Sequence, residues 1–197
     1  RNSYYSHVIP RALFLLVGHE LCRSQLKAYY GIPQNRIILI PFSPAKSILN
    51  SNKNNFEAAE LKSLAADKFI FYPAQYWAHK NHRFLIDVLK HYIDRTDPNL
   101  KLVFTGTDKG NLTFLKDYVT ELELSASVIF CGFVSNEDIR LLYEKCAAVI
   151  VPSFIGPGTL PSLEGLVLNA LVIVEDTIHN RDFYGPDMTY QSFDCPG

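Results

Sequence analysis

The chain lacks a marked excess of charge of either sign and a long apolar run. Its 19 Lys and Arg residues nearly balance its 20 Asp and Glu residues, so the composition predicts no basic surface for nucleic acid. No apolar run approaches the roughly 20 residues needed to cross a bilayer, and the first residues do not resemble a secretory signal peptide. We therefore expect a cytoplasmic protein that does not bind nucleic acid.

Motifs for several common sites are also missing. The four cysteines show no C-x-x-C spacing, which disfavours a zinc site and indicates a reducing compartment; they are Cys22, Cys131, Cys146 and Cys195. His79 and His82 lack an obvious third metal ligand, so a role at a helix start or in packing is favoured for them. No strand is followed by G-x-G-x-x-G, which argues against an NAD dehydrogenase, and no Gly-Lys-Ser/Thr marks a P-loop.

What the sequence does contain is a regular alternation of short apolar runs with helical periodicity. Apolar runs that do not alternate with polar residues indicate strands buried on both faces; we expect them at 12–17, 36–41, 68–73, 100–105, 127–131, 147–151 and 171–174. Helices are predicted between them, including one that ends at Gly31, one at 56–67 and one at 162–171. Repeated strand-then-helix units predict an α/β fold with a doubly wound, Rossmann-like parallel sheet.

Residues 42–55 are rich in Ser, Asn and Pro and are interpreted as a linker. We therefore divide the chain into residues 1–44, which end with this linker region, and residues 45–197, which hold the regular alternation.

Ligands of such sheets bind beyond the carboxyl ends of the strands, which selects the segments 73–82, 106–111, 132–138 and 152–165. The last is a Gly-containing loop that leads into a helix, an arrangement that favours an anion, although the glycines could simply form a turn. Lys80 offers a point charge for a phosphate, or is an ordinary solvated lysine. Glu164 could accept hydrogen bonds from ribose hydroxyls, or only complement the helix dipole.

Lys80 together with residues 132–153 and 158–176, at their spacing, resembles family 4 glycosyltransferases, which have the GT-B fold. This resemblance implies that residues 1–44 are the end of an N-terminal, acceptor-side domain and its linker. It implies that residues 45–197 are a nucleotide-sugar-binding C-terminal domain, truncated at its end.

In the family, an arginine and a lysine after the first strand of the second domain hold the donor diphosphate. Lys80 matches the lysine, whereas Gln75 stands at the arginine position. A Glu-x₇-Glu motif follows later: Glu164 matches the glutamate that contacts the ribose, and Gly156 stands where the other glutamate meets the transferred sugar. The two replacements put the usual charge pattern of the site in doubt.

Backbone atoms complete the implied site. Gly158, Thr159 and Leu160 match the main-chain donors to the diphosphate. Gly132, Phe133 and Val134 match the segment whose backbone meets the nucleobase. The catalytic residues that the resemblance implies are Lys80 and Glu164.

The function implied is that of a retaining hexosyltransferase fragment, inactive in isolation, which binds a nucleoside-diphosphate sugar without a metal. The acceptor would be a saccharide or lipid-linked saccharide, bound through the missing domain, in polysaccharide assembly at the cytosolic face of a membrane. The alternative is a degenerate nucleotide-binding or scaffolding module without catalysis. A third possibility, another GT-B-like enzyme such as a sugar-nucleotide epimerase, is disfavoured by the loop pattern at 152–164.

Overall fold

The computed structural model describes residues 2–50, 55–56, 59–62, 64, 68–154 and 160–193. Short 3-10 turns (η) accompany the helices and strands. In chain order the elements are α1 (Asn2–Val8), η1 (Ile9–Arg11), β1 (Leu15–Val17), α2 (Glu20–Tyr30), η2 (Gln34–Arg36), β2 (Ile37–Leu39), α3 (Lys46–Leu49), α4 (Ala59–Lys62), β3 (Phe69–Pro73), η4 (Ala78–Lys80), α5 (His82–Ile93), β4 (Lys101–Thr105), α6 (Leu112–Glu121), β5 (Val128–Phe130), α7 (Asn136–Lys145), β6 (Ala148–Val151), α8 (Leu160–Val167), β7 (Val172–Glu175), α9 (Ile178–Tyr184) and β8 (Thr189–Gln191).

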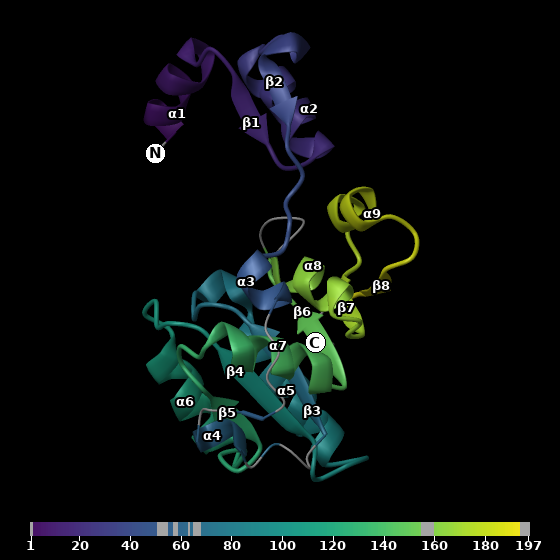
Figure 1. Ribbon diagram of the computed structural model, residues 1–197. Helices are drawn as coiled ribbons and strands as arrows, with labels where there is room; N and C mark the ends of the chain where they lie inside the picture. Colours follow the sequence, from purple (N-terminus) through teal and green to yellow (C-terminus); the bar gives the residue numbers. More distant parts are fainter. Residues whose placement is uncertain are drawn as a thin grey trace.

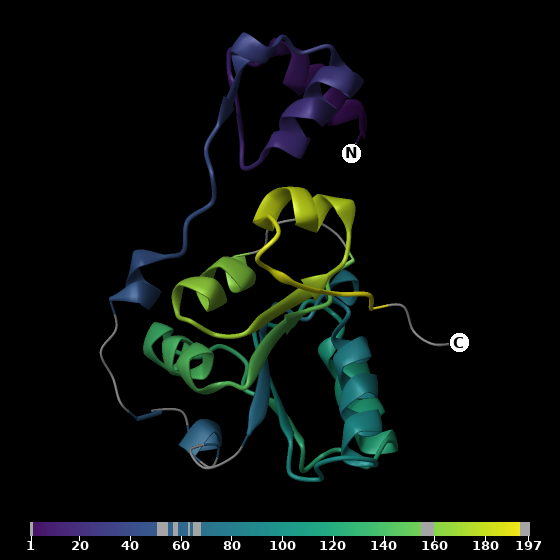
Figure 2. The same ribbon diagram turned by 90° about the vertical axis from the view of Figure 1, so that its right-hand side faces the viewer.

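The larger part of the chain is built on a six-stranded parallel sheet. Its strand order is β5-β4-β3-β6-β7-β8, and Phe71 at its centre pairs with Val103 on one side and Val149 on the other. Helices α5 and α6 cover one face, and α7 and α8 cover the other (Figure 2). The predicted α/β fold with a doubly wound parallel sheet is confirmed.

Side-chain spacing explains why these helices pack as they do. On α5, Leu85, Ile86 and Leu89 are buried, because residues three and four apart share one face of a helix. Helix α7 begins as expected, with Ser135 accepting a hydrogen bond from the backbone N–H of Asp138 at 3.1 Å, which satisfies one of the free donors of the first turn.

One predicted helix boundary is wrong by several residues. The helix expected at 162–171, with Pro161 in its first turn, is α8 at Leu160–Val167, which starts as expected and ends sooner. It stops because Asn169 adopts a left-handed conformation with φ 59°, and Ala170 then donates its N–H to the carbonyl of Gly165 at 2.9 Å, a closing pattern of helix C-termini. Of the helix expected at 56–67, residues 59–62 form α4, whereas Phe56 is not helical.

The segment 42–55 is not entirely a linker. It contains the one-turn helix α3, whose Leu49 carbonyl accepts a hydrogen bond from the Arg140 guanidinium on α7. Strand β8 and helix α9 were not predicted at all. The other strand predictions agree with the structure to within a few residues.

Residues 2–39 form a smaller unit with a two-stranded parallel sheet of β1 and β2. An extended segment, residues 40–45, connects this unit to the rest of the chain (Figure 1). Contact between the two parts runs through α2 and α9, where the rings of His19 and Phe183 meet edge to face, with 5.6 Å between their centres. Among the described residues, no helix combines the length and apolar character needed to span a membrane.

Candidate functional site

The strand order places a topological switch point between β3 and β6. From β3 the chain adds β4 and β5 on one side, then returns to add β6, β7 and β8 on the other. The loops after β3 and β6 therefore leave the sheet in opposite directions, which opens a crevice at the carboxyl ends of the strands. The sequence-predicted residues Gln75 and Lys80 follow β3, and the Gly-containing loop follows β6.

Hydrogen bonds hold both ends of the loop after β3 and join this loop to the loop after β6. His82 Nε2 lies 3.2 Å from the carbonyl oxygen of Ala74, and the Tyr72 hydroxyl donates to the carbonyl of Lys80 at 3.1 Å. The N–H of Phe154, which follows β6, donates to the carbonyl of His79 at 3.1 Å. These bonds span the switch point and bring the Lys80 segment beside the loop that follows β6.

His82 is the anchor of this arrangement. It is only 1% exposed, and its ring packs among the rings of Tyr72, Tyr76 and Phe104 at centre distances of 5.0–5.2 Å. Burial lowers the pKa of His82 to about 4, so the ring is neutral at pH 7 and its Nε2 carries the hydrogen that binds Ala74. The expected role in packing at a helix start is confirmed.

Lys80 lies half-buried at the switch point. Burial lowers the pKa of its ammonium group below the ordinary value, because removing water from a charge favours the neutral form. Across the parts of the chain that the structure describes, no carboxylate forms an ion pair with Lys80. A bound anion would restore the lost stabilisation of the charge.

A cavity of about 260 Å³ opens at the carboxyl ends of β3, β4 and β5. Four of the predicted donor-site residues line it together, namely Gln75 from the loop after β3 and Gly132, Phe133 and Val134 from the loop after β5. Phe133 is 86% exposed, so this ring stands in solvent above the cavity instead of filling the core.

The loop after β4 contributes residues that sequence reasoning selected only as a segment. Gly106 and Thr107 line the same cavity. Gly106 adopts φ 144°, and a Cβ added to it would lie 2.4 Å from the carbonyl oxygen of Ala74. Its N–H also donates to the carbonyl of Gly132 at 2.7 Å. A glycine directly after a buried strand was the available signal for this close approach.

Glu164 lies on α8 and is 7% exposed. The Tyr143 hydroxyl donates to its Oε2 at 2.9 Å. Burial raises the pKa of the Glu164 carboxyl above its ordinary value, and the Tyr143 hydrogen bond opposes that shift. The carboxyl does not line the cavity at Gln75. Leu160 is the first residue of α8 and is exposed, whereas Gly156, Gly158 and Thr159 lie outside the described residues.

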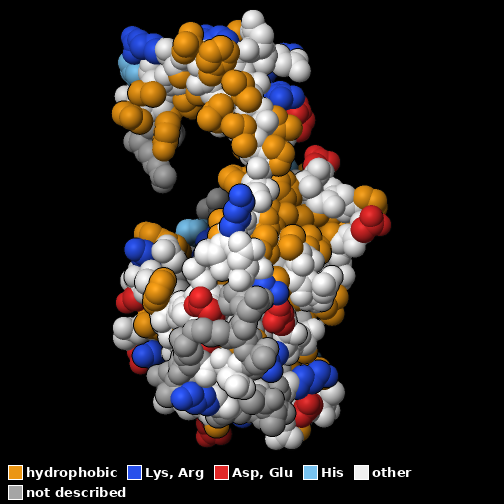
Figure 3. Space-filling view, in the orientation of Figure 1, with side chains coloured by type: hydrophobic (Ala, Val, Ile, Leu, Met, Phe, Trp, Pro, Cys, Tyr) orange, Lys and Arg blue, Asp and Glu red, His pale blue; other side chains and the backbone are white. Residues whose placement is uncertain are grey.

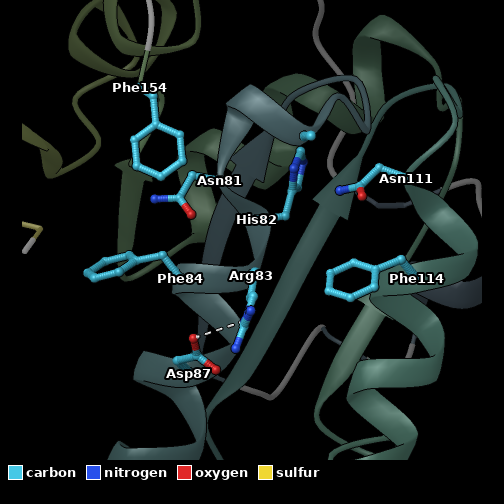
Figure 4. A pocket seen from close by; sticks show the side chains of 9 residues that line it. Asn81, His82, Arg83, Phe84, Asp87, Asn111, Phe114 and Phe154 are labelled. Atoms are coloured by element: carbon cyan, nitrogen blue, oxygen red, sulfur yellow. Dashed lines mark ion pairs between the residues drawn. The ribbon is translucent and has the colours of Figure 1, made fainter. Parts of the chain in front are cut away.

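A second cavity of about 460 Å³ lies between the start of α5 and the start of α6 (Figure 4). Phenylalanine rings stand around it, and its charged groups are engaged with one another. Arg83 pairs with Asp87 at 3.7 Å and lies over the ring of Tyr118, whose hydroxyl in turn donates to Asp87. These contacts tie α5 to α6 beneath the loop that carries Lys80.

Comparison with known proteins gives consistent similarities. The model of a family described as glycosyl transferases group 1 matches residues 53–188. The O-antigen chain mannosyltransferase RfbU of Salmonella typhimurium is 31% identical over 170 residues, which cover 85% of this chain and 43% of that protein. An uncharacterized glycosyltransferase of Methanocaldococcus jannaschii, MJ1607, is 28% identical over 109 residues, covering 55% of this chain and 27% of its own length.

Solved structures share the fold at low identity. Anabaena Alr3699/HepE, in complex with UDP and glucose, superposes with a TM-score of 0.77 at 16% identity and covers 96% of this chain and 52% of its own. Sucrose-phosphate synthase from Thermosynechococcus elongatus gives a TM-score of 0.72 at 17% identity, covering 96% and 48%. The chain thus spans about half the length of these structures and less than half of the curated relatives.

Proposed function

The chain belongs to the glycosyl transferases group 1 family, and from this premise we propose that it forms the donor half of a hexosyltransferase site. It binds a nucleoside-diphosphate sugar, and the full-length enzyme transfers the hexose to a saccharide acceptor with retention of configuration. Retention follows from the resemblance to family 4. The name mannosyltransferase of one relative, and the UDP and glucose bound by one structural neighbour, support a hexose donor.

The observation that carries the proposal is the meeting of separate loops at one edge of the sheet. Gln75 and the 132–134 segment line one cavity, and the Lys80 segment is hydrogen-bonded to the loop after β6 through His79 and Phe154. A nucleoside diphosphate has a base, a ribose and an anionic diphosphate. The proposed arrangement places the base near residues 132–134 and the diphosphate near Lys80.

Charge neutralisation is the proposed chemical contribution of this half. As the bond between the sugar and the diphosphate breaks, negative charge grows on the departing phosphate. The Lys80 ammonium and the backbone N–H groups of Gly158, Thr159 and Leu160 would stabilise that charge. Of these three residues, Leu160 is the first residue of α8. Protein groups alone supply this stabilisation, and the proposal includes no metal.

Glu164 is proposed to accept hydrogen bonds from the ribose hydroxyls. Its Oε2 is held by Tyr143, while its Oε1 has no hydrogen-bond partner within the described part of the chain. The Tyr143 contact would keep the carboxylate in one orientation. For the Glu164 carboxylate to reach the ribose, the donor has to extend from the cavity toward α8.

The acceptor side belongs to the rest of the full-length protein. A saccharide or lipid-linked saccharide would bind through the preceding domain, and polysaccharide assembly at the cytosolic membrane face fits such an acceptor. The alternative is a nucleotide-binding or scaffolding module without catalysis, which the neutral residues Gln75 and Gly156 favour. Calorimetric titration with UDP, GDP and ADP separates a donor site from a scaffold, because a scaffold binds none of the three nucleotides.

Replacing Lys80 with alanine in the full-length protein tests the mechanism directly. We expect turnover to fall by at least about tenfold, since the growing charge on the diphosphate loses its ammonium partner. Lys90→Ala is the matched control, because Lys90 is a lysine of α5 that pairs with Asp94 at 3.1 Å, away from the cavity. Steady-state kinetics of both variants give the comparison, and unchanged turnover for Lys80→Ala removes Lys80 from the mechanism.

A further inference from the structure

A hydrogen bond from a neighbouring side chain orients the neutral side chain of Gln75. The indole N–H of Trp77 donates a hydrogen bond to Gln75 Oε1 at 3.0 Å. An indole nitrogen is a donor only, so the group it meets on Gln75 has to be the amide oxygen. The contact therefore fixes which end of the amide is which.

The contact with Trp77 leaves the amide nitrogen of Gln75 free to donate. With the oxygen held by Trp77, Gln75 Nε2 is directed away from the indole and keeps both of its hydrogens for other partners. No acceptor among the described residues bonds to this nitrogen. Gln75 is exposed and lines the 260 Å³ cavity together with Thr107 and the 132–134 segment. The residue that carries these free donors therefore borders the space proposed for the nucleotide sugar.

Trp77 is positioned by contacts at the protein surface and not by packing in the hydrophobic core. Its side chain is 43% exposed, which is unusual for the largest apolar residue. The His79 ring stacks on it at a centre distance of 6.1 Å, and Lys109 Nζ lies 6.0 Å from its ring centre. Its backbone N–H also donates to the Gln75 carbonyl at 2.7 Å. These contacts hold the indole beside Gln75, which itself lines the cavity.

We infer that Trp77 is a positioning residue, which orients the Gln75 amide so that its N–H groups donate to an oxygen of the donor diphosphate. This inference rests on the proposed function. A guanidinium at position 75 would bind phosphate by charge and needs no partner to define its donors. A glutamine has one donor end and one acceptor end, and without Trp77 the acceptor end could equally face the anion.

A double-mutant cycle in the full-length protein tests this role, with the Kd of the nucleoside diphosphate that binds best, among UDP, GDP and ADP, as the readout. Trp77→Phe keeps an aromatic ring but removes the N–H together with the five-membered ring that carries it. We expect it to weaken binding by about fivefold, the effect of one lost hydrogen bond. In the background of Gln75→Arg, Trp77→Phe should leave Kd unchanged, because a guanidinium has no acceptor for the indole N–H.

Gln75→Glu is the third variant of the series. A carboxylate still accepts the indole N–H but offers no donor to the phosphate, so binding should weaken further than in Trp77→Phe. Thermal unfolding of every variant shows whether the fold is kept. If Trp77→Phe unfolds, Gln75→Glu still tests the donor role of the Gln75 amide, because its carboxylate keeps the contact with the indole N–H.

The outcomes separate the inference from the proposed function. Equal Kd values for the wild type and Trp77→Phe overturn the positioning role while the donor site stands. An equal loss from Trp77→Phe with and without the Gln75→Arg substitution also overturns it, because it shows a general effect of Trp77 on the loop. If the wild-type protein binds none of the three nucleotides, the proposed function fails, and the inference that rests on it fails too.

Discussion

At the scale of single residues, the buried imidazole of His82 joins the stability of the chain to the geometry of the site. Its ring is hydrogen-bonded to the carbonyl of Ala74, the residue that immediately precedes Gln75. Desolvation is the largest cause of its lowered pKa, and the positive charge of Lys80 lowers it further. A proton on His82 would therefore be unfavourable both for burial and for the neighbouring cation.

This residue gives the fold a defined acid sensitivity. The pKa of His82 is about 4 in the folded chain, against 6.5 ordinarily. Below pH 6.5 the unfolded chain binds a proton that the folded chain does not, so the stability contribution is full above that pH and is lost as the pH falls toward 4. The loss between pH 7 and pH 4 amounts to about 3 kcal/mol.

Comparison with His82→Gln isolates this effect, because an amide can still donate to Ala74 and does not titrate. We expect the free energy of unfolding, measured with urea, to fall more steeply with acid in the wild type than in the variant. Subtracting the unfolding free energy of the variant from that of the wild type also cancels the contribution of Glu164, which both proteins share. That contribution has the opposite sign, because the raised pKa of Glu164 favours the folded state at low pH. Parallel curves for the two proteins would show that His82 titrates normally.

At the scale of elements, the loops after β3, β4 and β5 form the cavity because their backbones approach one another closely. Gly106 is the point of contact: its N–H reaches the carbonyl of Gly132, and its Cα faces the carbonyl of Ala74. The backbone of Tyr76 continues this pairing by donating to the Thr107 carbonyl at 3.1 Å. Three loops are thus joined by main-chain contacts that only a residue without a side chain permits.

Gly106→Ala should separate these loops. The added Cβ would meet the Ala74 carbonyl oxygen at 2.4 Å, at a φ that L-residues rarely adopt. We expect a loss of more than about 1 kcal/mol in the free energy of unfolding, together with weaker nucleotide binding.

Gly110→Ala provides the matched comparison for this prediction. Gly110 also has a positive φ, of 92°, but a Cβ there would have no atom within 4 Å. It therefore experiences the backbone strain without the collision, and the difference between the variants measures the close approach. Equal losses in the two variants, by calorimetric unfolding and nucleotide titration, would mean that the contact at Ala74 is not tight.

At the scale of the whole molecule, the two parts of the chain differ in how well they are packed. The large buried cluster draws its residues from the range 56–188. The unit of residues 2–39 carries many exposed apolar side chains, among them Leu13, Leu16 and Tyr29. Hydrophobic side chains cover much of the face of this unit that Figure 3 shows. Its sheet has only two strands of three residues each.

Amide hydrogen exchange of the 197-residue chain should show this difference. We expect the amides of β1 and β2 to exchange at least roughly a hundredfold faster than those of β5, because local opening of a two-stranded sheet exposes little apolar surface. Strand β5 is a fair standard, since it also has three residues and lies at a sheet edge, but packs on the core. Comparable protection would mean that the contact of α2 with α9 stabilises the smaller unit.

The sequence by itself determined the parallel sheet, five of its six strands (β3 to β7) and the edge at which a ligand site is expected. Unbroken apolar runs such as 69–71 and 102–104 can be buried only between two layers of helices, and parallel strands bring their carboxyl ends to one edge. Local pattern also fixed the start of α7 at Ser135, because a capping hydrogen bond spans only three residues.

Only the tertiary structure decided how the side chains at that edge meet. The contact of Trp77 with Gln75, the close approach of Gly106 to Ala74 and the burial of Glu164 against Tyr143 depend on positions fixed by packing across the sheet. Strand β8 also escaped prediction, because its short polar sequence becomes a strand only by pairing with β7. Periodicity reports which face of an element is buried, whereas the partner of an atom is set by how separate elements come together in space.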